Sequence, residues 1–589
     1  MLNTLLERNA VAKLKVTEIC EKDVFNPIFN DVDCFASRTK WSQYMKRRDF
    51  LRAAVIGSAA FAADVLSCSS SKGQKPNILF IICDDLNDAV DGFGGHPQAK
   101  TPHLDRLAKQ GVRFSNAQVN SPVCGPCRAS FLTGLYPHTT GYFGYNFHKN
   151  HWRYNPTLAR SVTFLDYFRD NGYKVMGTGK IFHNNQEEWS VWDAFGAKPS
   201  WGPWPWDGTP DIEYSHGQLN PWGNAAVHPD FADNYGIGDM FGPLSNVPEV
   251  PPDPQKGIPG YKGWRLFHKS FRYVNEDDRD LMPDELNAQW ASEKLSEQHD
   301  RPFLMCVGMN RPHEPMFAPQ RYFDMFPLDE IELAPIKEED LADCAKALTQ
   351  PPAQVGLYGH RRYRYYLKTG GVKMLKRWTQ AYLANVAFVD DQIGKVLKAL
   401  ESSSYTDNTY IFFTSDNGYH MGEKLYIFKN SVWEESCRVP FIVAGPGVNQ
   451  DVVCDHPISL VDLYPTFIDL CNIDKETNHS SNRQPLDGFS IKPFLEDPKN
   501  GRWEGPDVAL TAVMSLDKLK LGEPGQIERQ HYSLRSKRYR YVFCNSGEEE
   551  LYDHAADPNE WNNLAHDTNY DELREQLNKQ LMQMLKKST

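Results

Sequence analysis

Largely apolar runs recur along the middle of the chain, and segments with helical periodicity separate them. Runs without polar alternation are typical of strands buried on both faces of a sheet, and they occur at 77–83, 302–308, 409–414 and 439–444, with a shorter one at 173–177. Apolar positions with a period near 3.6 predict helices at 101–111, 157–171, 284–298, 378–400 and 460–470. This alternation predicts an α/β fold whose mostly parallel central sheet is flanked by helices.

The end of the chain has a different pattern. Residues 473–507 are polar and rich in proline and glycine, which indicates a linker. Beyond it, 530–545 alternates as a strand does, another strand starts at 550–553, and 570–586 has the period of an amphipathic helix. We therefore expect a main domain at 76–472 and a small C-terminal domain at 508–589 with an antiparallel sheet and a packed helix.

Two long segments of the main domain lack a clear period. Residues 189–264 are rich in proline, glycine and tryptophan, and include Trp201-Gly-Pro-Trp204-Pro-Trp206. These aromatic side chains either shape a ligand pocket or pin a large loop to the body of the protein. Residues 329–376 are charged, become basic toward 361–364, and are expected to form a loop with short helices.

Length, charge and cysteine content limit the number of domains and the possible classes of function. A chain of 589 residues is expected to form about two domains. Its formal net charge of -12 argues against a general nucleic-acid binder but permits an anionic substrate in a locally basic pocket. The 12 cysteines lack the spacing of zinc ligands. Cys124-x-x-Cys127 could suggest a redox pair, but the sequence has no second cysteine pair to accompany it, and this disfavours a redox site.

The N-terminal region resembles an export signal. Arg47-Arg48 forms a twin-arginine motif, and the apolar run at 53–63 is too short to span a membrane. A buried helix would explain the run but not the paired arginines. We expect a signal peptide at 45–68, with 1–44 a gene-model extension or disordered, and export to the periplasm or cell surface. Cys68 follows a loose lipobox, so either it is lipidated or it lies beside an ordinary cleavage site. A lipid on Cys68 would be the only membrane anchor that we expect.

Polar side chains follow several of the predicted strands. They are Asp84-Asp85, Lys180 with His183, His313, and Asp416-Asn417. In open α/β sheets, ligands bind at the carboxyl ends of the strands, so these groups are expected to converge on one edge of the sheet. Two adjacent buried carboxylates need a counter-charge, and oxygen ligands suit calcium or magnesium. Helix capping would account for only one of the two aspartates.

A cysteine motif lies between these strand ends. Cys124-x-Pro126-x-Arg128 forms a turn constrained by glycine and proline, and a short apolar helix is expected after it. Alone, the motif also fits a buried structural cysteine beside a surface arginine. With Thr133-Gly134, however, it resembles the signature of the sulfatases, Cys-x-Pro-x-Arg-x-x-x-x-Thr-Gly.

The resemblance to sulfatases extends over 76–565. It includes a C-terminal segment at 552–564, and it is most similar to iduronate-2-sulfatase-like enzymes at 179–183, 311–313 and 415–418. Asn417 departs from those enzymes, which typically have histidine there. The resemblance implies an alkaline-phosphatase-like fold, with 76–472 as the catalytic domain.

The resemblance also implies a set of site residues. Cys124 would be converted to formylglycine (3-oxoalanine) by a maturation enzyme, and its hydrate would attack sulfur. Calcium would be bound by Asp84, Asp85, Asp416, Asn417 and the modified Cys124. Arg128 would stabilise the hydrate, Lys180 and Lys429 would hold the sulfate oxygens, and His183 and His313 would move protons, with His313 also binding substrate. Lys424 and His420 match the family pattern less well than Lys429 does.

The activity that the resemblance implies is hydrolysis of a sulfuric ester. The expected substrate is a sulfated carbohydrate, either a polysaccharide or a glycosaminoglycan fragment, with iduronate 2-sulfate among the candidates. One alternative is a metal-dependent phosphatase or phosphodiesterase of the same superfamily, which would usually have a serine or threonine nucleophile. Another is a non-catalytic protein that binds sulfated glycans. The cysteine motif and the full set of site residues favour the sulfatase.

Overall fold

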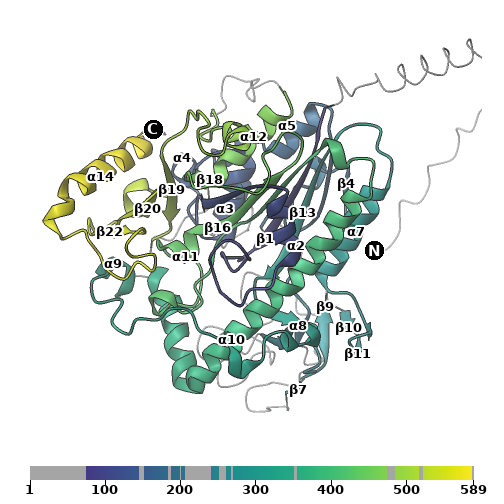
Figure 1. Cartoon of the computed structure of the whole chain (residues 1–589), viewed down its shortest axis with the longest axis horizontal. Helices are drawn as coiled ribbons and strands as arrows, with labels where there is room; N and C mark the ends of the chain where they lie inside the picture. Colours follow the sequence, from purple (N-terminus) through teal and green to yellow (C-terminus); the bar gives the residue numbers. More distant parts are fainter. Residues whose placement is uncertain are drawn as a thin grey trace, which may run out of the picture. The chain divides into compact units, whose positions relative to one another are not determined.

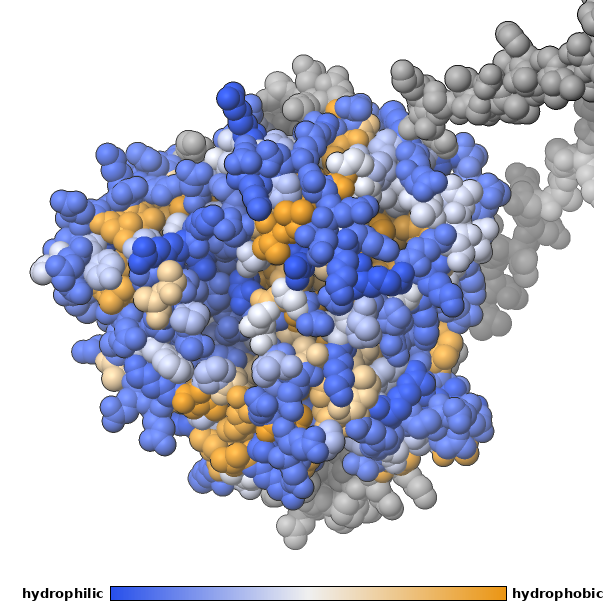
Figure 2. All heavy atoms as spheres, viewed as in Figure 1, coloured by the Kyte–Doolittle hydropathy of each residue, from blue (hydrophilic) through white to orange (hydrophobic). Residues whose placement is uncertain are grey.

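The computed structural model divides the chain into two units, Met1–Gly73 and Gln74–Thr589. The residues it describes all belong to the second unit: 75–144, 152–183, 187–198, 200–205, 241–247, 249–250, 261–266, 269–350, 355–473, 485–515 and 522–586. The expected signal peptide at 45–68, with Cys68, and the segment 1–44 lie outside the described residues. Hydrophilic side chains cover most of the face shown in Figure 2. Among the described residues, no helix is long and apolar enough to cross a membrane.

The core of the described residues is a nine-stranded sheet with the order β17-β2-β16-β15-β1-β13-β3-β4, and with β18 also paired to β2. Its strands are β1 (Asn77–Asp84), β2 (Gly111–Gln118), β3 (Lys174–Gly179), β4 (Ala194–Phe195), β13 (Phe303–Pro312), β15 (Thr409–Ser415), β16 (Arg438–Ala444), β17 (Val452–Cys454) and β18 (Ile458–Ser459). Strand β16 is antiparallel to both of its neighbours, and the other pairings are parallel. The predicted mostly parallel α/β sheet is confirmed.

Both faces of this sheet are buried, which explains the unbroken apolar runs. Alternate residues of β1 point to opposite faces, so Leu79 and Ile81 lie in one hydrophobic cluster and Ile78 and Phe80 in another. The first cluster is covered by α2 (Pro102–Lys109), α7 (Pro283–Ser296) and α10 (Val355–Glu401). The second is covered by α3 (Cys124–Thr133), α5 (Phe164–Asp170) and α12 (Leu463–Leu470). Figure 1 shows the sheet between these two sets of helices.

The C-terminal residues form a separate antiparallel sheet, as predicted. It has the order β19-β20-β21-β22 and comprises β19 (Val508–Val513), β20 (His531–Ser536), β21 (Tyr539–Phe543) and β22 (Glu549–Asp553). Helix α14 (Asp571–Lys586) packs on it through Leu577, Leu581 and Leu585, which recur once per turn. Within the expected linker, α13 (Lys492–Glu496) places Phe494 and Leu495 in the second cluster of the main sheet.

Several local predictions differ from the structure. Strand β2 was not predicted, because its sequence contains several polar residues and lacks an apolar run. Its place between β16 and β17 makes a strand favourable there. The helix expected at 157–171 is a 3-10 turn followed by α5, because the Thr163 side chain caps α5 by accepting a hydrogen bond from the Asp166 N–H. The segment 355–376, expected as a loop with short helices, is the first part of α10, which has a non-helical residue at Gly371.

Candidate active site

The polar strand ends meet at one edge of the sheet. The strands β15, β1, β13 and β3 are direct neighbours in the sheet and run parallel. Asp84 ends β1, and Lys180, His313 and Asp416 follow the ends of β3, β13 and β15. Residues that are up to 332 positions apart in the sequence are therefore adjacent, since the carboxyl ends of parallel strands share one edge.

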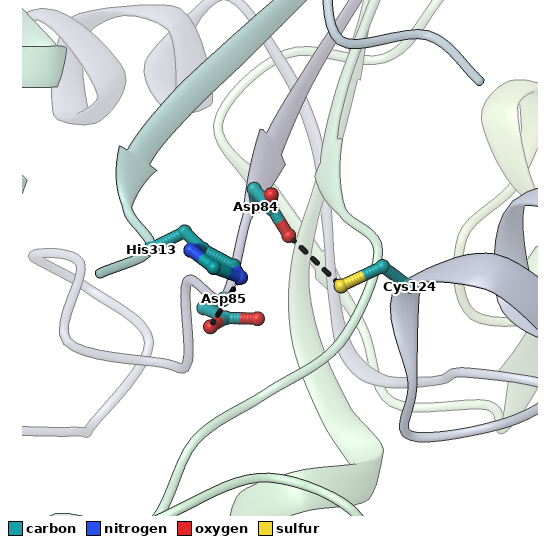
Figure 3. Close-up of side chains that lie close together, drawn as sticks. All are labelled: Asp84, Asp85, Cys124 and His313. Atoms are coloured by element: carbon teal, nitrogen blue, oxygen red, sulfur yellow. Dashed lines mark hydrogen bonds and ion pairs between the residues drawn. The ribbon is translucent and has the colours of Figure 1, made fainter. Parts of the chain in front are cut away.

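Cys124 reaches this edge from the first turn of α3. Its thiol donates a hydrogen bond to Asp84 Oδ1 at 3.2 Å, and Lys429 Nζ donates to its sulfur at 2.8 Å. One ligand atom from each of Asp84, Asp85, Cys124 and His313 lies within 4.8 Å of the others. Figure 3 shows these four side chains close together. Burial, together with nearby carboxylates, raises the pKa of the Cys124 thiol, so the thiol is neutral at neutral pH.

Arg128 lies one turn after Cys124 on the same helix. It is 1% exposed, which excludes the interpretation as a surface arginine. Its Nε donates to Asp416 Oδ2 at 2.7 Å, and its Nη1 donates to the carbonyl of Lys180. Its Nη2 is buried without a hydrogen-bond partner among the described residues. Arg128 therefore ties α3 to two strand ends and keeps one donor available at the site.

Two lysines balance the carboxylates. Lys180 Nζ pairs with Asp84 and Lys429 Nζ pairs with Asp85, and all four side chains are buried. Burial alone would raise the pKa of Asp84, but the ammonium of Lys180, with other nearby cations, holds it well below its usual value. For Asp85, burial outweighs the attraction of Lys429 and raises the pKa to about 6. The negative charge of Asp85 is thus less fully compensated by nearby cations than that of Asp84.

Asp416 completes the acidic group. Burial raises its pKa to about 6, even though Arg128 lowers it. Its Oδ1 accepts a hydrogen bond from the Asp85 N–H at 3.3 Å. Asp85 has a φ of 66°, in the left-handed region that costs most residues about 1 kcal/mol or more. That backbone is held by the Asp416 contact and by Tyr382, whose hydroxyl donates to the Asp85 carbonyl at 2.7 Å.

The donor set fits a hard cation. Asn417 donates from Nδ2 to Asp85 Oδ1 at 2.8 Å, which leaves its Oδ1 buried without a hydrogen-bond partner among the described residues. That oxygen and the carboxylates of Asp84, Asp85 and Asp416 are the ligand types that calcium and magnesium prefer. Asn417 can therefore supply an oxygen ligand in place of the histidine of iduronate-type enzymes.

The two predicted histidines face the same cluster. His313 Nε2 lies 3.8 Å from Asp85 Oδ2, and its Nδ1 is 2.6 Å from the Glu314 carbonyl, which can only accept. In neutral His313 the proton is therefore on Nδ1. Burial lowers the pKa of His313 to about 3. Burial and the charge of Lys180 also lower the pKa of His183 well below its usual value, so its imidazole is neutral at neutral pH.

The sequence did not identify Trp201 as a site residue individually, although its aromatic segment was noted. The Trp201 ring stacks on the His313 imidazole, with centroids 4.8 Å apart and planes at 14°, and Lys180 Nζ lies 5.1 Å from its centroid. Buried Arg311 holds the segment by donating to the carbonyls of Trp201 at 2.7 Å and Gly202 at 2.9 Å. Trp201 is half-buried, so it forms a wall of the site that orients His313.

Replacing Trp201 with alanine should impair catalysis more than folding. Loss of the stacked ring frees His313 and Lys180 to move, and we expect kcat/KM for a sulfate ester to fall about 10²-fold. Trp201→Phe should retain more activity because it keeps an aromatic face. The control is Trp189→Ala, which removes a half-exposed tryptophan that contacts Phe195. Equal activity of the Trp201→Ala and Trp189→Ala proteins would contradict the role of Trp201.

Lys424 and His420, the weaker alternatives in the sequence, make other contacts. Lys424 Nζ pairs with Asp340 Oδ1 at 3.0 Å and donates to the carbonyl of Glu560, which follows the C-terminal sheet. His420 Nε2 lies 2.8 Å from the Ser431 hydroxyl. Lys429, in contrast, contacts both Asp85 and Cys124. The structure thus places Lys429 in the site and Lys424 at the junction with the C-terminal domain.

Lys424→Met should therefore destabilise the protein without removing its activity. The change leaves Asp340 buried without its cation, and we expect the free energy of unfolding to fall by about 3 kcal/mol. Chemical denaturation would measure this loss, and kcat of the folded protein should change less than about twofold. A large fall in kcat at unchanged stability would instead place Lys424 in catalysis.

Comparison with known proteins assigns the chain to a family. The sulfatase family model matches residues 76–473, and the model for the C-terminal domain of N-sulphoglucosamine sulphohydrolase matches 422–587. A sulfatase from Formosa agariphila is 29% identical over 85% of this chain and 86% of its own length. Mouse iduronate 2-sulfatase is 28% identical over 67% of this chain and 63% of its own.

A solved structure supports the same fold. The structure of a 2-O GAG sulfatase aligns with a TM-score of 0.58 and 22% identity, and the alignment covers 87% of this chain and 93% of that one. The predicted fold, the convergence of the strand ends and the family model agree. The chain belongs to the sulfatase family of sulfuric ester hydrolases.

Proposed function

We propose that the protein releases inorganic sulfate from a sulfated carbohydrate, with a formylglycine made from Cys124 as nucleophile and a bound calcium ion. The observation that carries this proposal is the setting of Cys124. Its sulfur lies between Asp84 and Lys429, at the start of the helix that also carries Arg128. Burial raises the pKa of this thiol, and a protonated thiol is a poor nucleophile.

The cofactor groups have defined places in this proposal. Asp84, Asp85, Asp416 and Asn417 would hold calcium together with the modified residue 124, and calcium would supply positive charge beside the sulfate. The hydrated aldehyde would supply one hydroxyl to attack sulfur and a second whose deprotonation allows sulfate to leave. A thiol has no second hydroxyl, so unmodified Cys124 could not complete this reaction.

The protein's own residues then bind sulfate and move protons. Lys180 contacts Asp84 and Lys429 contacts Cys124, so both ammonium groups would neutralise the sulfate oxygens. Nη2 of Arg128, which has no hydrogen-bond partner within the described part of the chain, would do the same. His183, whose imidazole is neutral at neutral pH, would accept the proton of the hydrate. The leaving alcohol would be protonated by Lys429 or by His313, and His313 would need to gain a proton on Nε2 as the anionic substrate binds.

Mass spectrometry and sulfate release would test this proposal. The peptide that contains residue 124 should carry an aldehyde in active protein, and an intact thiol there in fully active protein would refute the formylglycine assignment. The protein should hydrolyse aryl sulfates faster than aryl phosphates. Faster phosphate hydrolysis would favour the phosphatase or phosphodiesterase alternative, and binding of sulfated glycan without sulfate release would favour the non-catalytic one.

The proposal of a carbohydrate substrate rests on two similar proteins and on the aromatic side chain of Trp201. Two similar proteins are described as an iduronate 2-sulfatase and a 2-O GAG sulfatase, so a glycosaminoglycan or related polysaccharide sulfate is proposed here, with iduronate 2-sulfate as one candidate. Trp201 places an aromatic surface beside His313, where a sugar ring could pack. A screen of sulfate release from defined sulfated sugars would identify the substrate, and inactivity on all carbohydrate sulfates would overturn this assignment.

We also propose export through the twin-arginine route, with maturation of Cys124 before export because that route carries folded proteins. The proposal rests on Arg47-Arg48 and the apolar run at 53–63. Arg47→Lys/Arg48→Lys should leave the protein in the cytoplasm, and Cys68→Ala should release it from membranes if Cys68 is lipidated. Unchanged export of the double-lysine variant would refute the route.

A further inference from the structure

We propose that a multiply sulfated glycan chain binds to an accessory surface on the first part of α10. This surface, called the basic face below, is the exposed side of the helix formed by Arg361, Arg364 and Lys368. The inference rests on the proposed sulfatase function and adds a substrate class to it. The preferred substrate would be an oligomer or polymer that carries several sulfate groups, of which one enters the active site.

The three cations lie together on one side of the helix. Positions 361, 364 and 368 are spaced by three and four residues, so they share a face, and all three side chains are exposed. At 1.5 Å per residue, they extend over about 10 Å. The non-helical backbone at Gly371 ends this segment.

The positive charge here contrasts with the rest of the chain. No aspartate or glutamate occurs from 355 to 389, whereas the whole protein has a net charge of -12. Seven cations fall within 17 positions of this segment: Arg361, Arg362, Arg364, Lys368, Lys373, Lys376 and Arg377. Within the described part of the chain, neither Arg364 nor Lys368 forms an ion pair with a carboxylate. The charges of Arg364 and Lys368 are therefore available to an anionic ligand.

The same helical turns border the active site on their inner side. Arg362, which is buried, pairs with Glu314, the neighbour of His313, and donates to the Tyr419 hydroxyl at 3.1 Å. The ring of Tyr358 lies 4.4 Å from that of Phe428, the neighbour of Lys429. The helix that carries the basic face thus packs against both segments that bring His313 and Lys429 to the site. Further sulfates of a bound chain would meet this helix as the chain leaves the site.

A glycan fits this surface better than a membrane does. A helix that binds membranes needs a continuous free apolar face, but here Tyr363 and Tyr366 are buried against the protein, although Leu367 and Val372 are exposed. A net charge of -12 also repels an extended anionic bilayer, whereas three cations over about 10 Å match a few sulfate groups.

Charge reversal tests the basic face. The test variant is Arg361→Glu/Arg364→Glu/Lys368→Glu in the full chain, and the control is Lys395→Glu/Lys398→Glu/Lys579→Glu, which makes the same charge change at exposed lysines elsewhere. Sulfate release is measured from heparin-type polysaccharide and from a small aryl sulfate, at low and at high salt. The test variant should have a KM for the polysaccharide raised about tenfold or more at low salt, an effect that falls to about twofold or less near 1 M salt.

The small substrate separates this inference from the proposed function. The test variant should hydrolyse the aryl sulfate as the natural protein does, because the basic face does not contact the reacting group. An unchanged KM for the polysaccharide, or an equal change in the control variant, would overturn the inference. The inference would also be overturned if the test variant no longer sedimented with phosphatidylserine vesicles but kept its KM for the polysaccharide. That result would indicate a surface that binds membranes. Inactivity of the natural protein on every sulfate ester would instead refute the proposed function.

Discussion

Cys124→Ala should abolish sulfate release, with a loss of at least about 10⁴-fold in kcat, because the variant lacks the nucleophile. The neighbouring groups, Lys429 and Asp84, would remain in place and could still bind an anion. Since only a small buried side chain is shortened, the melting temperature should change by a few degrees at most. Sulfate release and thermal unfolding measured on the same preparation would check both parts of this prediction.

The matched control for this variant is Cys127→Ala. Cys127 lies three residues later on α3, is equally buried, and belongs to the hydrophobic cluster of the sheet rather than to the polar site. Its alanine variant should keep near-normal activity. Cys124→Ser should be inactive unless the maturation system also oxidises serine. Near-normal activity of Cys124→Ala would eliminate the proposed nucleophile, whereas equal losses in both variants would point to damage of the helix.

Removal of the proposed calcium ion should have the second-largest effect. Treatment with a chelator should lower kcat at least about 10²-fold, because the proposed ion would no longer add its positive charge to those of Arg128, Lys180 and Lys429 at the sulfate. It should also destabilise the protein, since a ligand at 100 times its dissociation constant contributes about 2.7 kcal/mol. Added Ca²⁺ should restore both activity and stability, and elemental analysis of the purified protein would identify the ion.

A variant of one proposed ligand would link this effect to the site. Asp85→Asn should raise the Ca²⁺ concentration needed for half-maximal activity at least about tenfold. The control is Asp390→Asn, a buried aspartate on α10 whose oxygens accept hydrogen bonds from the N–H groups of His103 and Leu104. It should not alter the Ca²⁺ requirement. Full activity of a protein shown to be free of metal would refute the calcium site.

The sequence alone predicted most of the residues that the structure brings together at the sheet edge, because its signals are local. Cys124, Arg128 and the strand-end residues Asp84 and Asp416 occur in short motifs next to strongly apolar runs. An unbroken apolar run requires burial on both faces, and a polar group directly after it must lie at the end of a buried strand. These local constraints predicted the α/β sheet, the small C-terminal sheet and the family.

Local signals also explain where the prediction of elements was wrong. Strand β2 lacks an apolar run, because its hydrogen-bond partners on both sides stabilise polar positions that would not form a strand alone. The first part of α10 has a high density of charge, which predicted a loop with short helices. It is held as a helix by buried contacts such as the pair between Arg362 and Glu314.

The sequence by itself therefore determined the family and predicted the nucleophile and the types of metal-binding residue. Only the tertiary structure decided that β15, β1, β13 and β3 are neighbours, that Lys429 rather than Lys424 reaches Cys124, and that Trp201 stacks on His313. The physical reason is that periodicity and motifs report how a residue relates to its neighbours along the chain. Strand order and side-chain contacts across hundreds of residues depend on which surfaces pack together, and no local pattern encodes that choice.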